Sequence, residues 1–227
     1  MILKLNGLKF SFENFLEFAI IYKDIFIKKE YCFVAENDSP LILDCGAHIG
    51  ISALFFKKLY PDSRIICFEP NPRTFKQLEL NIKQNNLKDV VLINKAVADK
   101  KGEIDFFISK REKSPWGWGD SIVKNKWHHL KKLKMIKIDA VNLSSFINKK
   151  VDLLKLDVEG IEGRVLEEIE DKLFLVKEII VEFHKNKIDS ENKLENILLI
   201  FDKNGFKYTI KQKKHDSSLL MINSKRS

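Results

Sequence analysis

The chain has 227 residues and a formal net charge of +8, and 44% of its residues are hydrophobic. This length allows one sizeable core, and the positive charge is spread along the chain, so it supports an anionic partner only weakly. The three cysteines show no Cys-x-x-Cys spacing, and no apolar run is long enough to cross a membrane. Charged residues interrupt any signal-peptide core. We therefore expect a cytoplasmic protein with reduced thiols.

Residues 1–38 are predicted to form an N-terminal helical cover in front of a main domain over residues 39–227. Ser11 is a candidate N-cap, and the apolar residues that follow recur at helical spacing. Packing of this helix on the domain is favoured over a helix lying on a membrane surface. The predicted apolar face consists of Phe12, Phe15, Leu16, Ala19, Tyr22 and Phe26.

The pattern of residues 41–71 is strand, glycine turn, helix and strand. Leu41 opens a short apolar run, Gly46 and Gly50 bracket a turn, and Glu69 follows the apolar residues of the next strand. Ligands of open α/β sheets bind at the carboxyl ends of the strands. An acid about twenty residues beyond the glycine turn suits the two hydroxyls of a ribose.

The glycine turn separates two classes of cofactor. His48 stands where a dinucleotide site needs its middle glycine, so a pyrophosphate would meet an imidazole. S-adenosylmethionine has a ribose and an adenine but no pyrophosphate, and Asp44 adds negative charge near its sulfonium and ammonium groups. This stretch therefore favours S-adenosylmethionine, although an ordinary βαβ unit has the same outline.

The remaining elements predict five βα units and a closing hairpin, which is an open, mostly parallel α/β sheet. Asn71 and Pro72 mark the start of the helix after the second strand, and residues 94–96 follow the third strand, where an adenine would lie. One more strand begins at Val151. The other predicted strands span residues 41–43, 65–68, 90–93, 103–108, 178–183, 206–210 and 218–222.

Residues 110–137 are the least regular part of the sequence. Trp116 and Trp118 lie among glycines and a proline, Ser121 follows, and lysines dominate residues 124–137. We predict a loop in which Trp116, Trp118 and Ser121 line the substrate site, because long loops with large aromatic residues are usually functional. The alternative is a surface excursion whose tryptophans pack on the domain. Nucleic acid is not the favoured partner, because Trp127 alone interleaves the lysines.

Five ordered pieces of the chain resemble the FkbM-type family of S-adenosylmethionine-dependent methyltransferases. The resemblance implies a class I methyltransferase (Rossmann-like) fold, with an open, mostly parallel seven-stranded sheet, helices on both faces and a C-terminal antiparallel hairpin. It also implies, most often, O-methylation of sugar or natural-product hydroxyls. The family usually has Asn at the position of His48. The pieces are Asp44-Cys-Gly-Ala-His-Ile-Gly50, Phe68-Glu-Pro-Asn71, Asn94-Lys-Ala-Val97, Leu154-Lys-Leu-Asp157-Val-Glu-Gly160 and Val181-Glu-Phe-His184.

The candidate site residues lie at the predicted carboxyl ends of the strands. An alcohol has to lose its proton as it accepts a methyl group, so a base should lie within reach. His184 titrates near neutrality and is the candidate base, Asp157 is a candidate orienting group, and Glu159 is a candidate partner of the imidazole. A metal bound by these oxygen and nitrogen ligands is an alternative, but their spacing does not demand one, and none is assigned. The candidate cofactor-binding residues are Asp44, Gly46, Ala47, His48, Gly50, Glu69, Pro70, Asn71, Lys95, Ala96 and Asp157.

The leading hypothesis is an O-methyltransferase that acts on a sugar, a glycan or a small natural product. An RNA or protein methyltransferase that uses residues 124–137 is the second hypothesis, and a non-catalytic S-adenosylmethionine-binding protein is the third. No Asn-Pro-Pro-Tyr-like tetrapeptide follows the fourth strand, which disfavours methylation of base amines. The sequence names neither the acceptor nor the oligomeric state.

Overall fold

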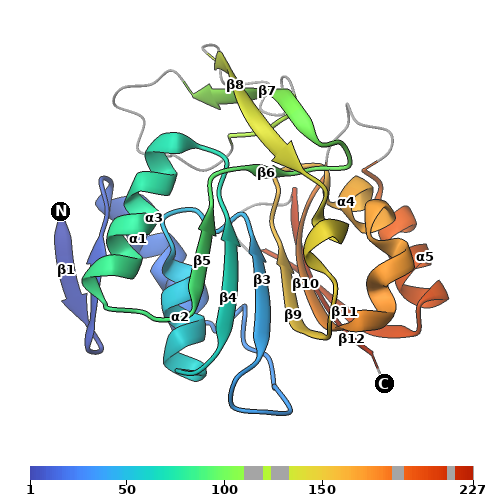
Figure 1. The fold of residues 1–227 in the computed structure, drawn as a ribbon, viewed down its shortest axis with the longest axis horizontal. Helices are drawn as coiled ribbons and strands as arrows, with labels where there is room; N and C mark the ends of the chain where they lie inside the picture. Colours follow the sequence, from blue (N-terminus) through green and yellow to red (C-terminus); the bar gives the residue numbers. More distant parts are fainter. Residues whose placement is uncertain (110–119, 124–132, 186–191, 214–217, 227) are drawn as a thin grey trace.

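The computed structural model describes residues 1–109, 120–123, 133–185, 192–213 and 218–226. A central sheet has helices packed around it, and a smaller sheet lies above one of its ends (Figure 1). The central sheet has seven strands in the order β11-β12-β10-β9-β3-β4-β5. These strands are β3 Leu41–Cys45, β4 Arg64–Phe68, β5 Val90–Ile93, β9 Val151–Leu156, β10 Val176–His184, β11 Phe206–Gln212 and β12 Leu219–Arg226.

The topology of this sheet confirms the predicted class I methyltransferase fold. Strands β10, β9, β3, β4 and β5 run parallel, and β12 pairs antiparallel with both β10 and β11 as the predicted C-terminal hairpin. The chain runs outward from β3 to β5 and then crosses to β9 on the other side of β3. The strand order therefore reverses between β3 and β9, which is where open α/β sheets bind their ligands.

The period-2 pattern of the buried strands builds a core on each face of the sheet. Ile42 and Leu153 pack with α2 (Ile51–Leu59) and α3 (Pro72–Gln84), whereas Leu43 and Leu154 pack with α4 (Glu162–Glu168) and α5 (Leu194–Lys203). Helix α3 begins as predicted, with Pro72 in its first turn. Among the described residues, no helix is long and apolar enough to cross a membrane.

The N-terminal segment contains a β-hairpin that the sequence analysis missed. Strands β1 (Ile2–Leu5) and β2 (Leu8–Ser11) pair antiparallel around Asn6-Gly7. Both turn residues have positive φ, 51° for Asn6 and 84° for Gly7. An Asn-Gly pair between alternating apolar residues is the strongest short-range hairpin signal, so the sequence did contain this information.

The first helix starts three residues later than predicted. Ser11 ends β2, and Asn14 caps α1 (Phe15–Tyr22) by accepting hydrogen bonds from the N–H groups of Leu16 and Glu17. The predicted apolar face was therefore wrong in part, because Phe15 is 57% exposed while Phe18 is 2% exposed. A short π-helix, η1 (Lys23–Ile27), continues the segment. The domain boundary at residue 38 stays a prediction.

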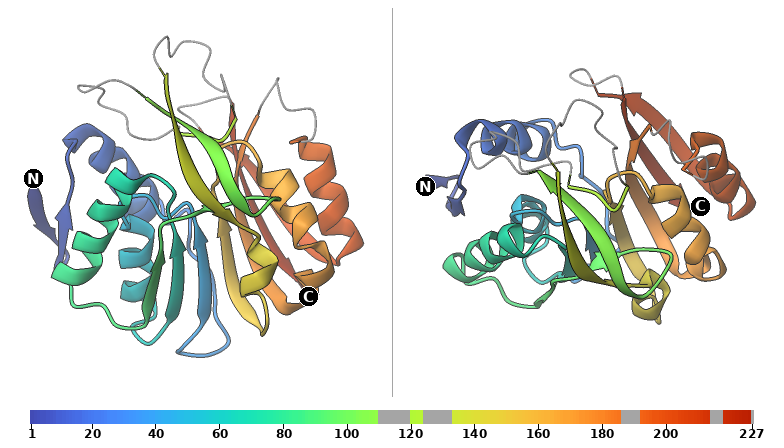
Figure 2. Two further views of the ribbon diagram at one scale, coloured as in Figure 1. Left: turned by 45° about the horizontal axis from the view of Figure 1, so that its top comes forward. Right: turned by 90° about the horizontal axis from the view of Figure 1, so that it is seen from above.

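A three-stranded sheet lies across the top of the central sheet (Figure 2). It consists of β6 (Ala96–Val97), β8 (Leu133–Val141) and β7 (Gly102–Ser109), in that order. Strand β7 was predicted, but β8 falls in the part considered least regular. Its alternation is short: Ile136, Ile138 and Ala140 turn inward and alternate with the exposed Lys137 and Asp139, but Lys134 and Met135 before them are both exposed. Two 3-10 helices, η2 (Leu143–Phe146) and η3 (Glu170–Leu175), complete the described elements.

Candidate active site

The glycine turn after β3 joins the ends of three strands. Gly46 has a φ of +83°, and a Cβ there would lie 1.9 Å from the carbonyl oxygen of Asp157. Its N–H and that of Ala47 both donate to the carbonyl of Phe68, at 3.0 and 2.9 Å. At Gly50 a Cβ would lie 2.6 Å from Cδ1 of Leu78, so this second glycine lets α3 pack against the turn. Both glycines are therefore required by close packing as well as by positive φ.

Glu69 lies at the carboxyl end of β4, as predicted, with a side chain directed back to the turn. One carboxylate oxygen accepts the N–H of His48 and the other accepts the N–H of Asn71, each at 2.9 Å. The Asn94 side chain donates to the carbonyls of Glu69 and Pro70, at 2.8 and 3.2 Å. Glu69 is 6% exposed, and this burial raises the pKa of its carboxyl to about 7.

His48 joins the turn to the N-terminal helix. Its φ is +49°, and its Nε2 lies 3.3 Å from a carboxylate oxygen of Glu17 on α1. Burial lowers the pKa of His48, but the hydrogen bond and the charge of Glu17 outweigh burial, so the pKa is raised above its ordinary value. Sequence reasoning missed Glu17, although a charged residue within an otherwise apolar helix is a usable signal.

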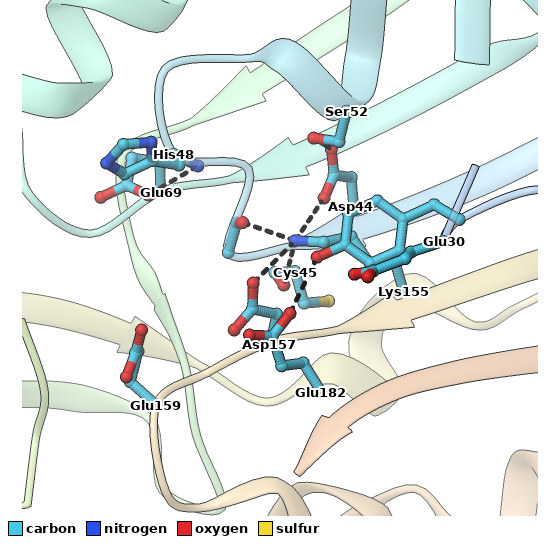
Figure 3. Close-up of polar contacts among 12 residues, drawn as sticks. Glu30, Asp44, Cys45, His48, Ser52, Glu69, Lys155, Asp157, Glu159 and Glu182 are labelled. Carbon is cyan, nitrogen blue, oxygen red and sulfur yellow. Dashed lines mark hydrogen bonds and ion pairs between the residues drawn. The ribbon is translucent and has the colours of Figure 1, made fainter. Parts of the chain in front are cut away.

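Lys155 is the centre of a buried polar network at the point where the strand order reverses (Figure 3). Asp44 of β3 and Lys155 of β9 are register partners, and both are almost fully buried. The Lys155 ammonium donates to the carbonyl of Gly46 at 2.6 Å and lies 3.2 Å from Asp44 and 3.5 Å from Asp157. Burial lowers the pKa of Lys155, but the charges of Asp44 and Asp157 raise it above its ordinary value.

This network changes the role that the sequence suggested for Asp44. Its side chain is fully buried and accepts a hydrogen bond from the Ser52 hydroxyl at 2.5 Å as well as contacting Lys155. Lys155 therefore offsets the negative charge that was expected to face the cofactor directly. Sequence reasoning missed Lys155, although a lysine within the apolar run of a central strand is a signal for a buried ion pair.

The N-terminal segment also reaches this network. The Tyr31 ring centroid lies 5.2 Å from the Lys155 ammonium, and its hydroxyl donates to Glu182 of β10 at 3.2 Å. Burial raises the pKa of Tyr31 well above its usual range, so the hydroxyl keeps its proton. Lys213 contacts the same Glu182 oxygen at 2.8 Å and lies 3.3 Å from Glu30.

His184 lies between two carboxylates at the carboxyl end of β10. Its Nδ1 lies 2.9 Å from Glu162 of α4, and its Nε2 lies 3.2 Å from Glu159. The predicted pairing of His184 with Glu159 is thus present in the geometry. Glu162, which sequence reasoning missed, makes the shorter contact. Glu162 is fully buried, whereas the Glu159 side chain is 21% exposed.

Asp157, Glu182 and His184 together resemble a metal-binding group. One ligand atom from each lies within 4.8 Å of the others. Lys155 already faces Asp157, and Lys213 already faces Glu182, so two ammonium groups compete with any cation for these carboxylates. We therefore assign no metal to this cluster.

The remaining predicted site residues lie in different surroundings. Ser121 is 2% exposed, and its hydroxyl donates to the Glu159 carbonyl at 2.6 Å. Ser121 is thus hydrogen-bonded to the residue whose side chain contacts His184. Lys95 contacts Asp139 of β8 at 3.4 Å, and both side chains are largely exposed. Ala96 is buried in β6. Trp116 and Trp118 lie outside the described residues.

The fold and this site define a class I, Rossmann-like methyltransferase. Residues 44–208 match the Methyltransferase FkbM domain, and the chain belongs to that family. It is 32% identical over 190 residues to Methyltransferase 1 of Beauveria bassiana strain ARSEF 2860, covering 77% of this chain and 76% of that protein. It is 26% identical over 174 residues to 2-O-methyltransferase NoeI of Sinorhizobium fredii, covering 71% of this chain and 70% of that protein.

Solved structures share the fold at low sequence identity. A methyltransferase FkbM from Methylobacillus flagellatus KT has a TM-score of 0.59 and 12% identity, over 85% of this chain and 45% of that chain. Magnesium protoporphyrin IX methyltransferase (ChlM) from Synechocystis PCC 6803, solved with bound SAM, has a TM-score of 0.55 and 10% identity, over 96% of this chain and 86% of that one. Membership of the FkbM family confirms the predicted S-adenosylmethionine-dependent methyltransferase.

Proposed function

We propose that this protein is an O-methyltransferase that methylates a hydroxyl group of a sugar, a glycan or another small acceptor, with His184 as the base. The observation that carries this proposal is the imidazole of His184, held between Glu159 and Glu162 beside Asp157. The name of the relative NoeI, a 2-O-methyltransferase, supports oxygen as the methylated atom. We also propose the cytoplasm as its location, since all three cysteines are free thiols.

The site fits the cofactor of the family. Glu69 offers a buried carboxylate that already accepts two N–H groups, and a ribose can add two hydroxyl donors. Four carboxylates, those of Asp44, Asp157, Glu159 and Glu182, outnumber the ammonium groups of Lys155 and Lys213, and this excess of negative charge favours a sulfonium and disfavours a pyrophosphate (Figure 3). S-adenosylmethionine supplies an activated methyl group on that sulfonium.

The residues of the chain then have separate tasks. Gly46 and Ala47 shape the turn, Glu69 holds the ribose, and Asp157, fixed by Lys155, orients groups near the methyl. His184 accepts the proton of the acceptor hydroxyl. Positioning and proton removal are the main requirements of methyl transfer to oxygen.

Cofactor binding is tested with Glu69→Ala. A hydrogen bond to a charged group contributes about 1.5–3 kcal/mol, so we expect the affinity for S-adenosylmethionine to fall roughly tenfold to a hundredfold in calorimetry. Glu79→Ala removes an exposed carboxylate from α3 and should leave the affinity unchanged. Equal affinities of wild-type protein and folded Glu69→Ala protein would exclude Glu69 as the ribose ligand.

The acceptor class is tested with methyl-labelled S-adenosylmethionine and a fractionated cell extract. We expect label in the glycan or small-molecule fraction, and a loss of that label in His184→Gln and Asp157→Asn proteins that still bind the cofactor. Label in RNA or protein would instead support an enzyme that uses residues 124–137. In the described part of that region, Lys137 already contacts Asp105 at 2.7 Å, which weakens it as a binding site for a polyanion. Cofactor binding without any labelled product would indicate a non-catalytic protein.

A further inference from the structure

We propose that Glu162 is a positioning residue that keeps the proton of His184 on Nδ1, so that Nε2 is the nitrogen that accepts the proton of the acceptor. This inference rests on the proposed function, in which His184 is the base. Glu162 has no role in that proposal, although it is fully buried in direct contact with the imidazole. Two neighbours of Glu162, the Gly160 N–H and the Asn192 amide nitrogen, can only donate hydrogen bonds to it.

The orientation of Asn192 is fixed by the backbone. The Gly163 N–H donates to Oδ1 of Asn192 at 2.8 Å, so the amide oxygen is on that side. The amide nitrogen therefore faces Glu162, to which it donates at 3.0 Å. The same nitrogen lies 3.2 Å from the carbonyl of His184, which is also an acceptor. If the amide were reversed, its nitrogen would face the N–H of Gly163, donor against donor. Its oxygen would face Glu162 and the carbonyl of His184, acceptor against acceptor.

Glu162 consequently accepts hydrogen bonds as a carboxylate. The Gly160 N–H donates to its first oxygen at 2.8 Å, and Asn192 donates to its second. Neither group can accept a hydrogen bond in return. The contact of His184 Nδ1 with the first oxygen, at 2.9 Å, is shorter than the 3.2 Å contact of Nε2 with the partly exposed Glu159, so a single ring proton is favoured on Nδ1. In the neutral imidazole, Nε2 is left as the acceptor.

Access differs between the two sides of the ring. Glu162 is fully buried behind Nδ1, whereas Glu159, beside Nε2, is 21% exposed. The acceptor therefore approaches from the Glu159 side. Its O–H bond breaks with the proton passing to Nε2, the oxygen bonds to the methyl carbon, and the C–S bond breaks with its electron pair left on sulfur. Glu159 and Glu162 then face the two N–H groups of the imidazolium.

The pH dependence of turnover follows from the charges that face the ring. These are Glu159, Glu162, Asp157 and Glu182, the last of which also contacts Lys213. The two carboxylates in contact with the ring favour the imidazolium, so turnover should rise with pH as Nε2 loses its proton. Removing the charge of Glu162 should move this rise to lower pH and also lower its plateau.

The test compares Glu162→Gln with Asp152→Asn. Asp152 is a carboxylate of similar burial on β9 that accepts the Leu41 N–H at 2.9 Å, far from the imidazole contacts. For Glu162→Gln we expect kcat to fall about a hundredfold, the rise of the pH profile to move to lower pH, and the affinity for S-adenosylmethionine to stay unchanged. Asp152→Asn should keep the wild-type pH profile. A wild-type kcat and pH profile in Glu162→Gln would overturn the proposal. A fall in activity that only follows the folded fraction would also overturn it.

A second measurement needs no variant of Glu162. Nitrogen NMR of the wild-type protein labelled at histidine reports the tautomer of each ring, and the spectrum of His184→Gln identifies the signals of His184. At a pH where the ring is neutral, we expect the proton on Nδ1, and a proton on Nε2 would overturn the proposal. Turnover retained in His184→Gln would refute His184 as the base. Lost turnover in His184→Gln together with a proton on Nε2 would refute only the role of Glu162 as the positioning residue.

Discussion

The carboxyl of Glu69 titrates within the pH range in which cofactor binding can be measured. Burial raises its pKa from 4.5 to about 7, while ribose hydroxyls bind the ionised form. Binding therefore favours loss of the proton, and the affinity for S-adenosylmethionine should fall about tenfold per pH unit well below pH 7. Calorimetry between pH 5 and 8 measures this change.

The matched variant for this prediction is Glu69→Gln, which keeps the shape of the side chain and removes its titration. Its affinity should be weaker at pH 8 and should change little with pH. A wild-type affinity that is constant from pH 5 to 8 would contradict the prediction, because the ribose would then not depend on the charge of Glu69.

Residues that a single motif places were predictable, and residues whose role depends on a partner far along the chain were not. Gly46 and Glu69 follow from the order of strand, turn and strand, and the structure places them together. Lys155 and Glu162 differ in kind. The role of Lys155 depends on its ion pair with Asp44 in the neighbouring strand, and the role of Glu162 depends on its contact with His184, 22 residues later in the chain. Side-chain pairing between separate elements cannot be read from local periodicity.

At the scale of elements, the ion pair of His48 and Glu17 holds helix α1 against the glycine turn. The pKa of His48 is raised in the folded protein, so the pair contributes stability that is fully present below pH 6.5 and is lost as pH rises through the raised pKa. His48→Asn should remove this contribution, about 0.2–1 kcal/mol, because Asn tolerates the positive φ of this position. Unfolding midpoints at pH 6 and pH 8.5 measure it.

A double-mutant cycle separates the pair from other titrating groups near the turn. Glu17→Gln should reduce the pH dependence of stability as much as His48→Asn does, and the double variant should add nothing further. If the two single effects add fully, the contact at 3.3 Å does not couple these residues.

Whole elements were predictable where apolar runs are long or turn residues are distinctive. Strands β3, β9 and β10 are buried almost throughout, and each was found from its apolar run. Strand β8 was missed because only five of its nine residues, 136–140, alternate clearly. The helical cover was predicted from apolar spacing with Ser11 as its cap, whereas the cap is Asn14 and the Asn6-Gly7 turn belongs to a hairpin that precedes a shorter helix.

At the scale of the whole molecule, the N-terminal segment belongs to the core on one face of the central sheet. Phe10 is fully buried, and its ring lies 5.4 Å from those of Phe18 and Tyr22 and 5.6 Å from that of Phe26, centroid to centroid. Phe10 belongs to the same cluster of buried residues as strands β3 and β4 and helix α2. Glu30 and Tyr31 also contact Lys213 and Glu182 near the other end of the chain. From these contacts we predict that residues 1–38 unfold together with the rest of the chain.

Phe10→Ala should therefore destabilise the whole protein, by about 3–5 kcal/mol, because it opens a cavity in this shared core. Phe15→Ala is the matched control, since Phe15 is 57% exposed and its removal should change stability by at most about 0.5 kcal/mol. Urea unfolding followed by tryptophan fluorescence and by circular dichroism should give one coincident transition in both variants, with a lower midpoint for Phe10→Ala. If Phe10→Ala instead produced a separate early transition and left the main midpoint unchanged, residues 1–38 would fold as an independent cover, and the boundary at residue 38 would be a physical one.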